Sequence, residues 1–124
     1  MLPPATKLTS LDVYRDGGSI SASFLSVDEI ECTLLFPVKK DLDLGNVGYL
    51  SPVLELFIPA VHTSKITGEA IPFHERETRP ISWQDAASLL EQLAPYASNF
   101  SSQYLWVFPE MVRASKNNGS RLDS

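Results

Sequence analysis

The sequence of 124 residues contains a single cysteine, Cys32. One cysteine excludes a framework of internal disulfide bonds and is typical of a protein that works in a reducing compartment. No apolar run approaches the roughly 20 residues that a membrane-spanning helix needs. The first residues also lack the basic and apolar segments of a secretory signal. We therefore expect a cytoplasmic protein with no membrane partner.

Positive charge is also scarce. Ten lysines and arginines stand against 15 aspartates and glutamates, which gives a formal net charge of -5. Binding of nucleic acid through its phosphates needs clustered basic residues, so nucleic acid is not an expected partner. The acidity suits a basic protein partner, or simply a soluble acidic surface. Hydrophobic residues make up 44% of the chain, enough for the core of one domain.

The usual catalytic motifs are missing. Asp16, Gly17 and Gly18 are too short a glycine-rich segment for a phosphate loop, and they join two expected strands. Of the two histidines, His62 and His74, the second is followed by a glutamate as in a zinc-binding helix. Thr78 stands where that motif needs its second histidine. We expect no catalytic residues, no metal and no cofactor, and predict that the protein is not an enzyme.

What the sequence does contain is a regular alternation of apolar and polar residues between positions 19 and 36. A period of two is typical of strands that have one face on a core and one face toward water. The predicted core face carries Ile20, Ala22, Phe24, Ile30, Cys32, Leu34 and Phe36. The predicted outer face carries Asp12, Tyr14, Ser19, Ser21, Ser23, Glu31, Thr33 and Leu35.

The first turn of this region is predicted at Asp16 and Gly17, because glycine tolerates the positive φ of a tight hairpin. A two-residue loop there places Val13 opposite Ile20, and the apolar faces of the two strands match. Three antiparallel strands are expected, over residues 10–15, 19–25 and 29–38.

The second turn is predicted as a three-residue loop over residues 26–28, or as a longer, bulged loop, with Asp28 in the left-handed conformation. This loop places Phe24 opposite Ile30 and Ala22 opposite Cys32. Cys32 then lies on the core face, where burial raises the pKa of a thiol. It is therefore not expected to act as a nucleophile.

Farther along the chain, residues 52–59 are predicted to form a fourth strand bounded by prolines. Residues 65–69 are typical of a turn between short strands, and 74–80 are expected to be a charged connector. The clearest helix is predicted over about 82–95. Ser82 is a good N-cap, and Asp85 suits the helix N-terminus.

The C-terminal part is predicted to contain a strand at 104–108, because its residues are aromatic and β-branched, and a short helix at 109–113. The fold class is therefore α+β, an antiparallel sheet that begins with a three-stranded meander and packs against one main helix. We expect an extended arm at 1–9, a single domain at 10–114 and a disordered tail at 115–124.

A group of acidic residues is the best candidate for a partner-binding site, because charge of one sign steers a partner of the opposite sign. The predicted partner-binding residues are Asp28, Glu29, Glu31, Asp41, Asp43 and Tyr14.

The sequence thus favours a small acidic protein-binding module, most specifically an inhibitor of the immunity or antitoxin type that neutralises a basic toxin or effector domain, as in bacteria. One alternative is an acidic secretion-type chaperone or adaptor that forms a homodimer through Leu35 or the strand at 104–108. Another is a small enzyme or ligand-binding domain with a pocket near Trp83, His62 or His74.

Overall fold

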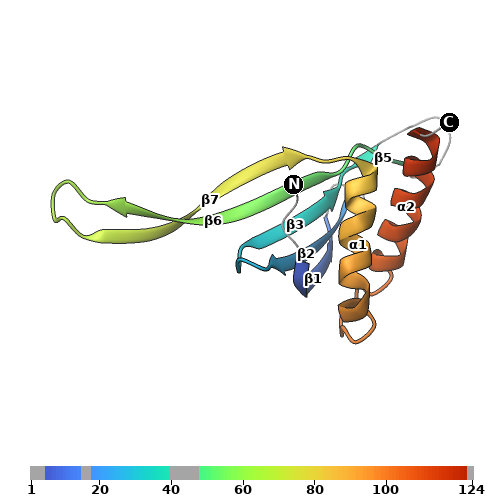
Figure 1. The fold of residues 1–124 in the computed structure, drawn as a ribbon, viewed down its shortest axis with the longest axis horizontal. Coiled ribbons are helices and arrows are strands. Elements are labelled where there is room, and N and C mark those ends of the chain that lie inside the picture. Colours follow the sequence, from blue (N-terminus) through green and yellow to red (C-terminus); the bar gives the residue numbers. More distant parts are fainter. Residues whose placement is uncertain (1–4, 15–17, 40–47, 123–124) are drawn as a thin grey trace.

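The computed structural model describes residues 5–14, 18–39 and 48–122. Five strands form one antiparallel sheet in the order β1-β2-β3-β6-β7, and two helices pack on one of its faces (Figure 1). The α+β class and the opening three-stranded meander are confirmed. The elements are β1 (Ala5–Val13), β2 (Ile20–Ser26), β3 (Glu31–Phe36), β4 (Val38–Lys39), β5 (Gly48–Tyr49), β6 (Val53–Thr63), β7 (Ala70–Pro80), α1 (Trp83–Ala97) and α2 (Val107–Leu122).

The first strand, β1, begins inside the segment 1–9 that was predicted as an arm. Its pairing with β2 is interrupted by shifts of register before Lys7 and before Ser10. Such bulges break the alternation that marks a strand, which is why the pattern predicted this strand only from residue 10. At the end of β1, Val13 lies opposite Ile20, which confirms the predicted register of the first hairpin.

The second turn is displaced from its predicted position. Phe24 pairs with Cys32 and not with Ile30, so the predicted register is wrong by two residues. The backbone N–H of Ser26 donates to the carbonyl of Ile30 at 3.0 Å, which closes a three-residue loop one position later than expected. Glu29, not Asp28, holds the left-handed conformation, with φ 61°. A slip of two residues preserves the face of every side chain.

Strands β6 and β7 form a hairpin that is longer than predicted. They pair from Val53 and Pro80 to Thr63 and Ala70. The prediction of a charged connector at 74–80 is therefore wrong, because these residues belong to β7, an edge strand whose charged side chains meet water. Strand β3 pairs with β6 only from Val53 to Phe57. Beyond that point the hairpin leaves the sheet and projects from the body of the molecule (Figure 1). We call residues 58–75 the β6–β7 arm.

Helix α1 begins as predicted. The Ser82 hydroxyl accepts a hydrogen bond from the backbone N–H of Asp85 at 3.0 Å, which satisfies a donor of the first turn. Pro95 lies in the last turn, and the helix continues to Ala97. Five side chains of α1 are buried: Trp83, Ala86, Leu89, Leu90 and Leu93.

The C-terminal part differs most from its prediction. Residues 104–106 form a turn, and α2 runs from Val107 to Leu122, so the predicted strand at 104–108 and the predicted disordered tail from 115 are both wrong. Pro109 is the third residue of α2, where a backbone N–H would have no helical acceptor. Its missing N–H therefore costs the helix nothing. The aromatic residues of this segment, which favour a strand, do not prevent the helix from forming.

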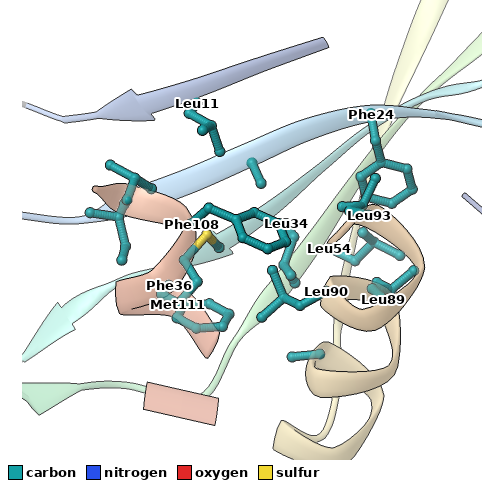
Figure 2. Packing of buried hydrophobic residues seen from close by; sticks show 14 of the residues in the cluster. Leu11, Phe24, Leu34, Phe36, Leu54, Leu89, Leu90, Leu93, Phe108 and Met111 are labelled. Atoms are coloured by element: carbon teal, nitrogen blue, oxygen red, sulfur yellow. The ribbon is translucent and has the colours of Figure 1, made fainter. Parts of the chain in front are cut away.

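The hydrophobic core lies between the sheet and both helices, and side chains from strands and helices point into it together (Figure 2). At its centre Phe36 is fully buried. Its ring packs edge-to-face on Trp83 of α1, with centroids 5.0 Å apart and planes at 77°, and more loosely on Tyr49 of β5 at 6.1 Å. Such aromatic pairs add to the stabilisation from apolar burial.

Cys32 points into this core and is 1% exposed. Burial is the main cause that raises the pKa of its thiol to about 11. In its native state the thiol is therefore protonated at neutral pH and shielded from reagents, as the sequence predicted.

We expect the native Cys32 thiol to react with a disulfide reagent at pH 8 at least about 100-fold more slowly than the same thiol in the protein unfolded by urea. The reagent reaches Cys32 only when the fold opens, and an opening that costs about 3 kcal/mol exposes the thiol in under about 1% of the molecules. Absorbance of the released thiolate measures both rates. A Val27→Cys variant is the control, since Val27 is exposed on the β2–β3 turn. Equal rates for Cys32 in the native and unfolded protein would contradict its placement.

Candidate functional site

The face of the sheet opposite the helices carries a groove made of two hollows. The larger has a volume of about 510 Å³ and is lined by Tyr14, Ser19, Leu35, Pro37, Glu55, Phe57 and Arg76. The smaller has a volume of about 330 Å³ and is lined by Thr9, Ser10, Ser23, Leu25, Glu31, Cys32, Thr33 and Phe57. Phe57 lines both hollows, so we treat them as one site and call it the outer-face groove.

The outer face of β2 carries small residues, and two of them, Ser19 and Ser23, line the groove. Ser21 lies opposite Asp12 of β1 and Leu35 of β3, and its side chain is 1% exposed between them. Ser19 is buried as well, although both serines were predicted to face water. Both serines lie on the predicted face of the sheet but are buried there, and Ser19 lines the larger hollow.

The polar groups of the groove are mostly paired within the protein. The hydroxyls of Ser23 and Thr33 share a hydrogen bond of 2.9 Å across β2 and β3. Arg76 of β7 donates to the carboxylate of Glu55 on β6, and the Glu55 side chain is largely buried while that of Arg76 is exposed. The Arg76 cation and the exposed Glu31 carboxylate are therefore the charges that a partner meets first.

The acidic residues predicted to bind a partner are placed at one end of the groove. Asp28, Glu29 and Glu31 lie on or next to the β2–β3 turn, all exposed, and Glu31 also lines the groove. Tyr14 lines the groove at the other end of β2, where its N–H donates to the carbonyl of Ser19 at 2.8 Å. Seven residues of β2 separate the two ends by ~20 Å. Asp41 and Asp43 lie outside the described residues.

The other sites considered from the sequence are not brought together. His62 and His74 are both exposed on the β6–β7 arm, and the alternation of side chains along paired strands puts them on opposite faces. Trp83 packs edge-to-face on Phe36 and is buried in the core. Within the described residues no three histidine, cysteine or acidic side chains lie close enough to hold a metal ion.

The contributions of β6 and β7 to the groove were not predicted from the sequence. Glu55 and Phe57 alternate with the buried Leu54 and Leu56, and this spacing could have placed them on the outer face. The position of Arg76 depends on the hairpin pairing, where it lies opposite Phe57. A run of serines at every second position of a central strand is the signal that could have predicted a hollow there.

A second polar cluster joins β5 to α2 and has a structural role. The Tyr49 hydroxyl donates to the Glu110 carboxylate at 3.0 Å, and Arg113 donates to both oxygens of the same carboxylate at 2.6 and 2.9 Å. The hydrogen bonds from Arg113 are the main cause that lowers the pKa of Glu110. Burial is the main cause that raises the pKa of Tyr49 to about 12. Both groups are therefore held in one protonation state near neutral pH.

Comparisons of the chain with protein-family models, with curated proteins and with solved structures found no match. Among the described residues, the helices are too short or too polar for any of them to cross a membrane.

Proposed function

We propose that this protein is a non-enzymatic, cytoplasmic binding module of the immunity or antitoxin type, which neutralises a basic toxin or effector domain through the outer-face groove. The observation that carries this proposal is the groove itself. It lies on a sheet face that neither α1 nor α2 covers, it has aromatic and aliphatic walls, and its β2–β3 end is acidic.

The chemistry of the groove supports recognition of a protein surface. Tyr14 is exposed and Phe57 partly exposed, and buried aromatic contacts supply much of the affinity of protein interfaces. Asp28, Glu29 and Glu31 add negative charge at the β2–β3 end of the groove, where Glu31 lies opposite Phe57. With a chain of net charge -5, they favour fast encounter with a basic partner.

The first test is capture from a native lysate with the full-length protein as bait, followed by binding kinetics with the purified captured protein. We expect that protein to be basic and its association rate to fall at least about 10-fold between low and high salt. Phe57→Ala should weaken binding on the order of 10- to 100-fold, mainly through faster dissociation. Surface plasmon resonance measures both rates.

Charge reversal supplies a matched control for this test. Glu31 lines the groove, whereas Glu91 is exposed on α1, which covers the opposite face of the sheet. Glu31→Lys should slow association several-fold, and Glu91→Lys, which changes the net charge equally, should have a smaller effect. Equal effects of the two variants, or an association rate that does not depend on salt, would contradict the proposal.

A further inference from the structure

One asparagine of the chain is followed by glycine. Of the four asparagines, Asn46, Asn99, Asn117 and Asn118, only Asn118 precedes a glycine, Gly119. The side-chain amide of asparagine is chemically labile, because the backbone nitrogen of the next residue can attack its Cγ. Glycine has no Cβ, so its nitrogen is the least hindered nucleophile that can follow an asparagine. The sequence therefore makes the amide of Asn118 the most reactive of the four.

The structure places Asn118 inside a helix, where this attack is opposed. Asn118 lies in the second half of α2, which runs to Leu122. Its side chain is partly buried, and Nδ2 donates a hydrogen bond to the carbonyl of Ala114 at 2.7 Å. In an α-helix each backbone N–H is bound to the carbonyl four residues before it, and the helical ψ keeps the next nitrogen away from the Cγ of an asparagine. The attack therefore requires the helix to open at this point.

The C-terminal end of α2 is the part of this helix that opens most easily. Among the side chains of α2 that the structure describes, Ala114 is the last apolar one that is buried. Helix ends fray, and local opening costs least where few apolar contacts hold a segment. Gly119 weakens this end further, because glycine is a poor helix former. Opening from the C-terminal end therefore frees Asn118 while Val107 and Met111 stay in the core.

We propose that Asn118 is a site of spontaneous deamidation controlled by α2, slow while the helix is closed and faster when its last turns open. In the first step the nitrogen of Gly119 bonds to Cγ of Asn118 and gives up its proton. The side-chain nitrogen leaves as ammonia, and a succinimide ring forms. Water then adds to a ring carbonyl and a C–N bond of the ring breaks. Addition at Cγ gives aspartate, and addition at the backbone carbonyl gives isoaspartate.

Either product weakens the end of α2. Both lose the amide group that donates to the Ala114 carbonyl, and both gain a carboxylate, which makes the net charge one unit more negative than -5. A negative charge near a helix C-terminus opposes the helix dipole. Isoaspartate also adds a carbon to the main chain, which breaks the helical ladder of hydrogen bonds. This inference does not rest on the proposed function, because α2 packs on the sheet face opposite the outer-face groove (Figure 1).

Peptide mass mapping of the full chain, incubated at mildly alkaline pH, tests the proposal. We expect Asn118 to deamidate about 10-fold more slowly in the native protein than in the chain unfolded by guanidinium chloride, the factor given by an opening free energy of about 1.4 kcal/mol. Asn99 is the internal control, because it is exposed after α1 and is followed by Phe100. It should react far more slowly than Asn118 in the unfolded chain. Equal rates at the two asparagines there would overturn the proposal, as would equal rates at Asn118 in the native and unfolded protein.

Two glycine substitutions test whether α2 controls the reaction. Lys116 and Glu91 are both exposed and lie inside α2 and α1 respectively. Lys116→Gly should speed the native deamidation of Asn118 about 5-fold, the factor that corresponds to the roughly 1 kcal/mol by which glycine weakens a helix. Glu91→Gly is the matched control and should leave this rate unchanged. Equal effects of the two variants would contradict the control by α2.

A third variant tests the chemistry apart from the fold. Gly119→Ala adds a methyl group beside the attacking nitrogen, so deamidation of Asn118 in the unfolded chain should slow at least about 10-fold. The unfolded chain is used because alanine also strengthens the helix and would slow the native reaction by that route. An unchanged rate in the unfolded Gly119→Ala chain would exclude attack by this nitrogen and overturn the proposal.

Discussion

Replacing Phe36 by alanine is expected to lower the free energy of unfolding by about 3–5 kcal/mol. Phe36 is fully buried at the point where β3, α1 and β5 meet, and it contacts the rings of both Trp83 and Tyr49. Its removal loses the transfer energy of the ring and leaves a cavity that rigid neighbours cannot fill. Because a domain of this size has only about 5–15 kcal/mol of stability in total, the variant should be close to unfolding at 37 °C.

Urea denaturation followed by tryptophan fluorescence measures this loss, since Trp83 reports directly on the site. Phe73→Ala is the matched control, because it removes the same ring from a position that is 40% exposed on the arm. It should cost about 1 kcal/mol or less in the monomer. If the two alanine variants lost equal stability at a concentration where the protein is monomeric, the packing of Phe36 described above would be wrong.

Phe36 was already assigned to the core by the alternation of residues 19–36, and this illustrates what sequence can determine. A period of two fixes which face a side chain takes, whatever strand lies next to it. The predicted register of β2 and β3 was wrong by two residues, yet Cys32 still lies in the core, because only an odd slip moves a side chain to the other face.

Local pattern failed where non-local packing decides the structure. Tyr104, Trp106 and Phe108 alternate with aliphatic residues and so resemble a strand, but the chain turns and enters α2 at Val107. The helix forms because Val107 and Met111 pack into the core as one stripe, and this depends on the positions of α1 and the sheet. The strand at 52–59 and the turn at 65–69 were predicted, but the length of the β6–β7 hairpin was missed for a related reason, since charged residues are tolerated in an edge strand that water reaches.

The candidate site was predicted in part. The sequence placed Tyr14, Leu35 and Glu31 on the outer face, and all three line the groove. The burial of Ser19 and Ser21 on this face was not predicted, because it depends on side chains of the neighbouring strands. The walls supplied by Phe57 and Arg76 come from strands that follow β3 by about twenty residues or more, and the alternation within 19–36 contains no information about them.

The predicted C-terminal helix ended at residue 113, whereas α2 continues to Leu122, and a substitution at Ala114 is expected to have a large effect. Ala114 is 2% exposed on the face of α2 that also carries Val107 and Met111. Ala114→Asp would bury a carboxylate among apolar side chains, and Arg113, the adjacent cation, is already bound to Glu110. We expect a loss of more than about 3 kcal/mol at pH 7, measured by urea denaturation.

The matched control is Ala94→Asp, which makes the same change at an exposed position of α1 and should cost about 1 kcal/mol or less. The pH dependence gives a second check. Burial raises the pKa of the new carboxyl in the folded state, so its penalty is relieved as the pH falls toward its ordinary value of about 3.9. The gap in stability between Ala114→Asp and the wild type should therefore narrow at low pH, whereas that for Ala94→Asp should change little. If α2 were instead an unstructured tail from residue 115, Ala114 would lie at the frayed end of the domain and both variants would be equally mild.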